Sequence, residues 1–442
     1  MTDLRCATAR PRGARRWLAG AVVASLLLTA GCSDGGDDDS AGGTTSSSSA
    51  ADGSTTTGGE QTTATSPSVL EAEEVPAEDG SFYDVPDPMP AGAHGDLVRY
   101  QVTGDQPEGL TRYRVMYLSE TVTGDPTVVT GLVAVPDGEA PDGGWPVLTY
   151  ARGSSGIADD CAISMAIDGT QGADSVLAAE AWLVEDAVVE HDMVATVTDY
   201  EGIGGPGIHP FLSGVSEARA TLDIVRAAGD LPGLDLRDDV GIMGYSQGGH
   251  AALWANQEAG GWTPELVVHG TVSGAPASEV ASLLGPDGIF EKGSASLLAA
   301  GMAQEDPALD IEELLTLGGV EYADLMAASC RPDPAAVVAL MEDPLLQEDP
   351  ATSDTWQAWI EENTPGNAPA ASPVLIVHGD ADANVPVENS EALRARLCAG
   401  GTPTERRVVP GADHIAGAIP TIADGTAWLA GLIAGTQAPP TC

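Results

Sequence analysis

Apolar residues follow two different periods along the chain. Segments 96–104, 111–121 and 126–136 alternate apolar and polar positions and are rich in β-branched residues, which predicts antiparallel strands. Further on, short continuous apolar runs predict buried strands, and they alternate with stretches of helical period. The predicted buried strands are 145–153, 192–202, 238–246, 265–276, 371–386 and 404–414, and the predicted helices are 173–190, 216–231 (with Ser216 as N-cap), 248–260, 390–400 and 419–435. This alternation predicts an α/β fold with a mainly parallel sheet and helices on both faces.

One long segment, residues 278–368, breaks the alternation. It carries short amphipathic helical patterns divided by Pro and Gly, and no convincing strand. We interpret it as a helical insertion that forms a cap over the carboxyl ends of the strands. The α/β core would then comprise residues 81–277 and 369–442.

The N-terminal segment has the pattern of an export signal. Five arginines precede an apolar run that is too short for a comfortable membrane span, and the run ends in "LTAGC". We predict a lipoprotein signal peptide over residues 1–31 with Cys32 as the lipidated first mature residue; the alternative is an ordinary signal peptide cut near Ala30. Residues 32–80 are rich in Gly, Ser, Thr and Asp and predict a disordered tether. The protein is therefore expected to be exported and held at the cell surface, or else secreted.

Charge and cysteine content narrow the function classes. The formal net charge of −48 argues against nucleic-acid binding, and membrane contact is expected only through the lipid anchor. Beyond Cys32 there are four cysteines, Cys161, Cys330, Cys398 and Cys442. An even count in an exported protein predicts two disulfides, for which the count alone allows three pairings.

The stretch "VGIMGYSQGGH" places Ser246 between a predicted strand and a predicted helix. This context favours a nucleophile elbow over a chance match to the GxSxG pattern. Gly244 and Gly248 would relieve crowding where the chain reverses. The backbone N–H of Gln247 would then face a developing oxyanion, and the positive end of the helix would lie behind it.

A serine nucleophile needs a base, and the base needs an orienting acid. "VLIVHGDADANVP" places Asp380 and Asp382 just after one strand, and "VVPGADHIAG" places His414 just after the next. The loops at the carboxyl ends of strands collect ligands in open α/β sheets. We therefore predict Ser246, Asp382 and His414 as a catalytic triad, with Asp380 as the alternative acid.

A second oxyanion donor is expected from the loop after 145–153, with the N–H of Ser154 preferred and that of Ser155 next. Neither a metal site nor a cofactor is expected, because no His or Cys pair has the required spacing. Structural roles are predicted for the remaining histidines; His209 alone is a candidate for a role near the site, and the others are His94, His191, His250, His269 and His378.

Several blocks in order, among them "TDYEGIGGPGIHPFLSGVSEARATLDIVRAA" and "GIMGYSQGGHAALWANQEA", resemble the secretory lipase family of α/β-hydrolases, which includes lipases of the Candida antarctica lipase A type. The resemblance covers about residues 84–435. It implies an α/β-hydrolase core with a helical cap, the triad named above, and the disulfides Cys161–Cys330 and Cys398–Cys442. Arg152 departs from the family pattern, in which a histidine often precedes that glycine.

The leading hypothesis is a metal-independent serine hydrolase that cleaves carboxylic esters of the acylglycerol type, as a lipase or an esterase. Its expected substrate is a small-molecule ester or lipid. A serine peptidase or acylaminopeptidase-like hydrolase on the same fold is the second hypothesis, and a non-catalytic surface lipoprotein is the third.

Overall fold

The computed structural model describes residues 70–442 except 78, 105, 168–174, 285–288, 307 and 438. The predicted signal peptide, Cys32 and residues 33–69 of the expected tether lie outside the described residues. Within the described part of the chain, no helix combines the length and the apolar character that a membrane span requires.

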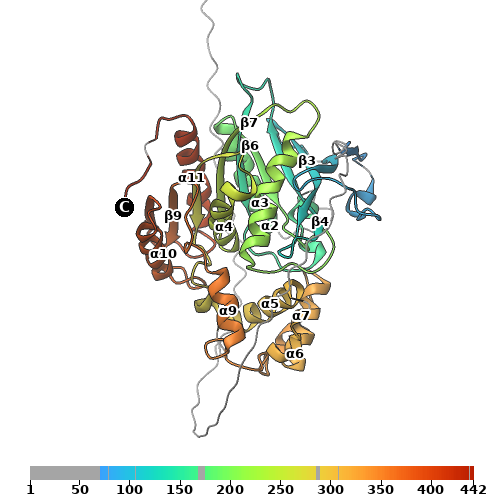
Figure 1. Cartoon of the computed structure of the whole chain (residues 1–442), viewed down its shortest axis with the longest axis vertical. Coiled ribbons are helices and arrows are strands. Elements are labelled where there is room, and N and C mark those ends of the chain that lie inside the picture. The colour runs from blue at the N-terminus through green and yellow to red at the C-terminus, as the bar shows by residue number, and fades with distance from the viewer. Residues whose placement is uncertain are drawn as a thin grey trace, which may run out of the picture. The chain divides into compact units, whose positions relative to one another are not determined.

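A ten-stranded sheet forms the centre of the fold, in the order β1-β2-β3-β4-β6-β5-β7-β8-β9-β10 (Figure 1). The pairs β2–β3, β3–β4 and β4–β6 are antiparallel, and every pair from β6 through β10 is parallel. The expectation of an α/β fold with a mainly parallel sheet is confirmed. The strands are β1 (Glu73–Glu74), β2 (Leu97–Val102), β3 (Leu110–Glu120), β4 (Pro126–Pro136), β5 (Trp145–Ala151), β6 (Val194–Thr198), β7 (Leu236–Tyr245), β8 (Val267–Gly274), β9 (Val374–Gly379) and β10 (Thr404–Val409).

Helices cover both faces of the sheet. Ile242 of β7 lies in a buried cluster with Leu222 of α3, whereas its neighbour Met243 lies in another with Leu429 of α11. Adjacent residues of a strand point to opposite faces, so both faces of β7 are buried, which explains its continuous apolar run. The helices are α1 (Ile163–Ala166), α2 (Ser175–Glu190), α3 (Gly214–Gly229), α4 (Gln247–Trp262), α5 (Ile289–Glu305), α6 (Ile311–Leu314), α7 (Leu317–Ala328), α8 (Pro334–Met341), α9 (Asp354–Asn363), α10 (Val387–Ala399) and α11 (Ala418–Ile433).

Two local predictions were wrong. The folded part was expected to begin near residue 81, but β1 pairs with β2 and Val75 is buried, with its N–H bonded to the Tyr100 carbonyl at 2.8 Å. A two-residue strand is too short to leave a pattern. Ser216 is not an N-cap, because α3 begins at Gly214 after Ser213; Ser216 instead donates to Glu201 Oε2 at 2.6 Å.

Helices α5–α9 lie between β8 and β9, and we call this segment the α5–α9 insertion. Figure 1 shows it beyond one end of the sheet. Its buried cluster includes Leu298 and Trp356 together with Ile157, Phe211 and Val385, which lie in loops that follow β5, β6 and β9. The insertion therefore packs on the loops at the carboxyl ends of the parallel strands.

Two disulfides close the fold. Cys161, after β5, is joined to Cys330 in the insertion with a Cα–Cα distance of 5.0 Å, and Cys398 of α10 is joined to Cys442 at 5.7 Å. Both pairings are those that the family resemblance implied. Each restricts the unfolded chain, and the first ties the insertion to a loop of the sheet.

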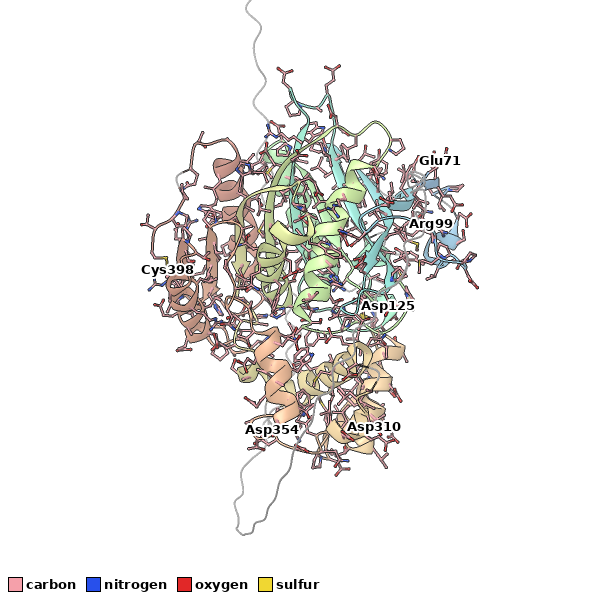
Figure 2. All side chains as sticks on the ribbon, viewed as in Figure 1. Glu71, Arg99, Asp125, Asp310, Asp354 and Cys398 are labelled. Carbon is pink, nitrogen blue, oxygen red and sulfur yellow. A yellow bond between two sulfur atoms is a disulfide. The ribbon has the colours of Figure 1, made fainter. Side chains whose placement is uncertain are left out.

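Acidic side chains lie mainly on the outside. Figure 2 shows Asp310 and Asp354 at the outer surface of the insertion, and Asp125 at the start of β4. All three are exposed. The large negative charge is therefore hydrated at these positions and does not require buried partners.

Several carboxyl groups are buried instead, and one of them lies at the junction between the sheet loops and the insertion. Glu201, in the loop after β6, is 7% exposed. Burial raises its pKa to about 7, against the lowering effect of the hydrogen bond from Ser216, and the negative charge of Glu305 on α5 adds to the increase. Ionisation of Glu201 therefore costs folding free energy.

We predict that Glu201→Gln changes the pH dependence of stability. The folded protein keeps the Glu201 proton up to about pH 7, whereas the unfolded chain releases it near the ordinary value of 4.5. The contribution of Glu201 to the free energy of unfolding should therefore fall between these two pH values, by up to about 3 kcal/mol. The variant should lack this fall, and thermal unfolding at pH 5 and pH 8 measures it. An equal stability difference between variant and wild type at both pH values would contradict the assignment.

Candidate active site

Ser246 is the single residue between β7 and α4. Its φ of 58° and ψ of −118° lie in a region that residues with a side chain rarely adopt. Its N–H donates to the Gly274 carbonyl at 2.8 Å. A Cβ atom at Gly244 would overlap the carbonyl of Gly248, and a Cβ atom at Gly248 would overlap that of Ala151. The two glycines therefore permit the sharp turn that exposes Ser246.

The predicted base and acid both lie within reach of this serine. His414 follows β10, and its Nε2 is 3.0 Å from Ser246 Oγ. Its Nδ1 is 2.6 Å from Asp382 Oδ2. The Tyr245 hydroxyl donates to the His414 carbonyl at 2.6 Å, so the residue before the serine helps to hold the histidine. The structure brings together all three residues of the predicted triad.

Asp382 is held by its own loop. Its Oδ1 accepts from the N–H groups of Asn384 and Val385, both at 2.9 Å, and His378 Nε2 lies 3.3 Å from its Oδ2. Burial alone would raise the pKa of this carboxyl. The hydrogen bonds from His378, His414 and the Val385 N–H together have a larger, opposite effect, and they hold the pKa well below its usual range. Asp382 is therefore ionised beside the imidazole.

Asp380, the alternative acid, has a different role. Its side chain accepts from the Gly411 N–H at 2.6 Å, and the residue is exposed. This bond ties the loop after β9 to the loop that carries His414. The Asp380 side chain does not contact the His414 imidazole in the way that Asp382 does.

The unusual Arg152 is buried beneath the loop after β5. Its guanidinium donates to the carbonyls of Gly153 at 3.1 Å and Asp199 at 3.0 Å, and also to the Ser155 hydroxyl. It lies 5.3 Å from the centre of the Tyr200 ring. Arg152 therefore fixes the loop from below, and Ser154 remains exposed above it.

Glu180 of α2 is a site residue that sequence patterns did not reveal. Its Oε2 accepts from the Gly153 N–H at 2.9 Å and from the Tyr150 hydroxyl at 3.1 Å. Burial raises the pKa of Glu180, and these two hydrogen bonds oppose the increase. The Gly153 N–H is thus occupied, and the next N–H along the loop is that of Ser154.

A second group that the patterns did not reveal surrounds the side chain of Gln247. Glu217 of α3 and His250 of α4 are fully buried, as is His209. Glu217 contacts both Gln247 and His250, and His209 contacts Gln247. Of these residues, the sequence singled out only His209 as a candidate for a role near the site; His250 was expected to be structural, and no pattern pointed to Glu217.

The arrangement can support nucleophilic catalysis. A hydroxyl, an imidazole and a carboxylate are joined by two hydrogen bonds in series, which is the geometry that acyl transfer through a serine requires. Among the described residues, no three or more His, Cys, Asp or Glu side chains are grouped so that they could hold a metal ion.

Solved structures with the same fold include Candida antarctica lipase A and the rice cell wall degrading esterase LipA from Xanthomonas oryzae. The first has a TM-score of 0.65 and 18% identity, and the match covers 79% of this chain and 84% of that one. The second has a TM-score of 0.61 and 17% identity, with 77% and 97% covered. At these identities the likeness shows the fold, which is that of the α/β-hydrolases.

Curated relatives are more similar in sequence. The "Probable inactive lipase MT1628" of Mycobacterium tuberculosis (strain CDC 1551 / Oshkosh) is 26% identical over 312 residues, 67% of each chain. Lipase 10 of Candida albicans (strain SC5314 / ATCC MYA-2876) is 23% identical over 355 residues, 74% of each chain. The model of the family described as "Secretory lipase" matches residues 173–439, more than half of this chain. The protein therefore belongs to the secretory lipase family.

Proposed function

We propose that the protein is a serine hydrolase of carboxylic esters, with Ser246 as nucleophile, His414 as general base and acid, and Asp382 as the group that orients the histidine. The observation that carries the proposal is the continuous pair of hydrogen bonds, 3.0 Å from Ser246 Oγ to His414 Nε2 and 2.6 Å from His414 Nδ1 to Asp382 Oδ2. Membership of the secretory lipase family supports the same activity.

The proposed reaction proceeds in two halves. Ser246 Oγ attacks the ester carbonyl carbon as His414 Nε2 takes the hydroxyl proton, and the carbonyl oxygen becomes an oxyanion. His414 then gives that proton to the leaving alcohol, and an acyl-enzyme remains. Water, deprotonated by His414, releases the acid and restores the serine. Asp382 stabilises the imidazolium that forms in each half.

The oxyanion is proposed to receive hydrogen bonds from two backbone N–H groups, those of Gln247 and Ser154. Gln247 is the first residue of α4, so its N–H belongs to the positive end of that helix. Ser154 follows Gly153, whose own N–H is bonded to Glu180. Donors of this kind act because they are fixed before the charge develops.

The proposed substrate is a small-molecule ester or lipid with an apolar acyl group. The α5–α9 insertion packs on the loops that follow β5, β6 and β9, and its buried cluster is apolar. We propose that this insertion is a cap that lines the acyl site. Rates on p-nitrophenyl esters of increasing acyl length would distinguish a lipase, which prefers long chains, from a short-chain esterase.

The protein is proposed to work outside the cytoplasm. Two disulfides persist only in an oxidising compartment, which supports export. We further propose that Cys32 carries a lipid and that the segment after it is a tether, because of the "LTAGC" stretch and the polar composition that follows.

A non-catalytic role is the second candidate, because one curated relative is named an inactive lipase. In this chain, however, the serine, histidine and aspartate are all present and hydrogen-bonded to one another. A protein that only binds its ligand has no need of that arrangement.

We predict that Ser246→Ala lowers kcat for p-nitrophenyl ester hydrolysis by at least about 10³-fold, because the variant has no nucleophile. A fluorophosphonate probe should label the wild type and leave the variant unlabelled. Retention of wild-type activity by the variant would show that another group is the nucleophile, and failure of the wild type to hydrolyse any ester or to react with the probe would favour the non-catalytic role.

We predict different outcomes at the two loop aspartates. Asp382→Asn should lower kcat by about 10²–10⁴-fold, because a neutral amide cannot stabilise the imidazolium. Asp380→Asn is the matched control and should change kcat less than about threefold, because the amide oxygen of asparagine can still accept from the Gly411 N–H. Steady-state kinetics measures both. A larger loss in Asp380→Asn would reverse the assignment of the acid.

A further inference from the structure

The side chain of Gln247 is enclosed by buried polar groups, although its proposed role in catalysis belongs to its backbone. Gln247 is 2% exposed, and Glu217, His209 and His250 are completely buried. Gln247 Nε2 lies 2.8 Å from Glu217 Oε1 and 2.7 Å from His209 Nε2. A buried amide with two short contacts has a fixed orientation.

The donors in this group follow from its surroundings. His209 Nδ1 faces the Glu201 carbonyl at 2.9 Å and must donate to it. Burial and the positive charge of Arg152 lower the pKa of His209 to about 3, so the ring is neutral and its Nε2 is an acceptor. The Gln247 amide therefore gives one N–H to His209 and the other to Glu217.

Glu217 accepts from three directions. Its Oε1 accepts from Gln247 and from the Leu212 N–H at 3.1 Å, and its Oε2 lies 2.7 Å from His250 Nδ1. His250 Nε2 faces the Asn363 carbonyl at 2.8 Å, so each ring nitrogen of His250 faces an acceptor. Glu217 thus joins the first turn of α4 to α3. His250, which contacts Glu217, in turn joins α4 to Asn363 at the end of α9.

This anchoring has a mechanical purpose at Ser246. A residue with a side chain held at a φ of 58° is strained, and this conformation persists only where its surroundings enforce it. Release of that strain would rotate the peptide between Ser246 and Gln247 and turn its N–H away from the substrate. The Gln247 side chain, whose Nε2 is held by two contacts, prevents this rotation from the helix side.

We propose that Glu217 is a positioning residue for the oxyanion: by fixing the Gln247 side chain, it holds the Gln247 backbone N–H in place for the transition state. The inference rests on the proposed ester hydrolysis. Glu217 itself contacts neither the substrate nor the reacting atoms.

The test is Glu217→Gln together with Gln247→Met and the double variant. In Glu217→Gln, an amide oxygen that accepts from His250 places the new NH₂ group against the NH₂ group of Gln247, and the contact between the two side chains is lost. Gln247→Met removes the amide that Glu217 fixes. Because Glu217 is proposed to act through that amide, the two substitutions should not add in their effect on kcat.

The expected result is a loss of kcat with little change in KM. Glu217→Gln should lower kcat by about 10–100-fold and change KM less than about threefold. The loss of kcat should not exceed the loss that follows removal of one oxyanion donor. A boronic acid that mimics the tetrahedral state should lose affinity in the same proportion. The double variant should lose no more kcat than Gln247→Met alone, to within about twofold.

Glu185→Gln is the matched control. Glu185 is also a buried carboxylate, 4% exposed and 2.5 Å from Arg112 on β3, but it lies outside this group. The Glu185→Gln variant should have a lower melting temperature than the wild type and a kcat within about twofold of the wild-type value. If Glu217→Gln lowers the melting temperature as this control does but keeps wild-type kcat, or if the double variant loses the product of the two single losses, Glu217 has only a structural role and the inference is overturned.

The crystal structure of Glu217→Gln gives a readout that does not depend on activity. A wild-type protein that hydrolyses no ester defeats the proposed function, whereas an active wild type with an unaffected Glu217→Gln defeats only this inference. A changed Ser246 φ or a rotated Gln247 peptide, found together with a loss of kcat, supports positioning by Glu217, and an unchanged backbone there overturns it.

Discussion

The conformation of one residue, Ser246, determines how the rest of the site is arranged. A positive φ directly between a buried strand and a helix brings the serine oxygen within 3.0 Å of His414 Nε2, and α4 begins at the next residue, Gln247. Nothing in the chemistry of serine favours that conformation. It depends on glycines that permit the turn and on buried side chains that prevent its relaxation, and so the site extends well beneath the surface.

The opposite wall of the site is built from loops. Asp382 is fixed by two N–H groups of its own loop and by His378, and the Asp380–Gly411 hydrogen bond ties this loop to the one that carries His414. Since β9 and β10 are adjacent and parallel, their following loops begin side by side. The sheet therefore supplies the coarse placement of acid and base, and short local hydrogen bonds supply the fine placement.

The parts of the molecule that could be predicted from sequence are those with a local pattern. Ser246, Asp382 and His414 each directly follow an apolar run, so their position at one edge of a parallel sheet could be anticipated. Glu217 could not, because a glutamate within the first turn of an amphipathic helix has the pattern of a solvated residue, and its partners lie about 30 residues away. The contacts that Glu180 and Arg152 make with the loop after β5 were also not predicted, because their partners include residues far away in the sequence. The cysteine count left three pairings, and the family resemblance was needed to select those that the structure contains.

The Cys161–Cys330 disulfide limits how the α5–α9 insertion can move. It joins the insertion covalently to the loop after β5, the loop that also carries Ser154. If this proposed cap swings to admit a substrate, the swing must pivot on the disulfide, and its widest excursion is at the end farthest from Cys330. Such a swing would also pull on the loop of Ser154, the proposed oxyanion donor, so that entry of the substrate and binding of the oxyanion would be mechanically connected.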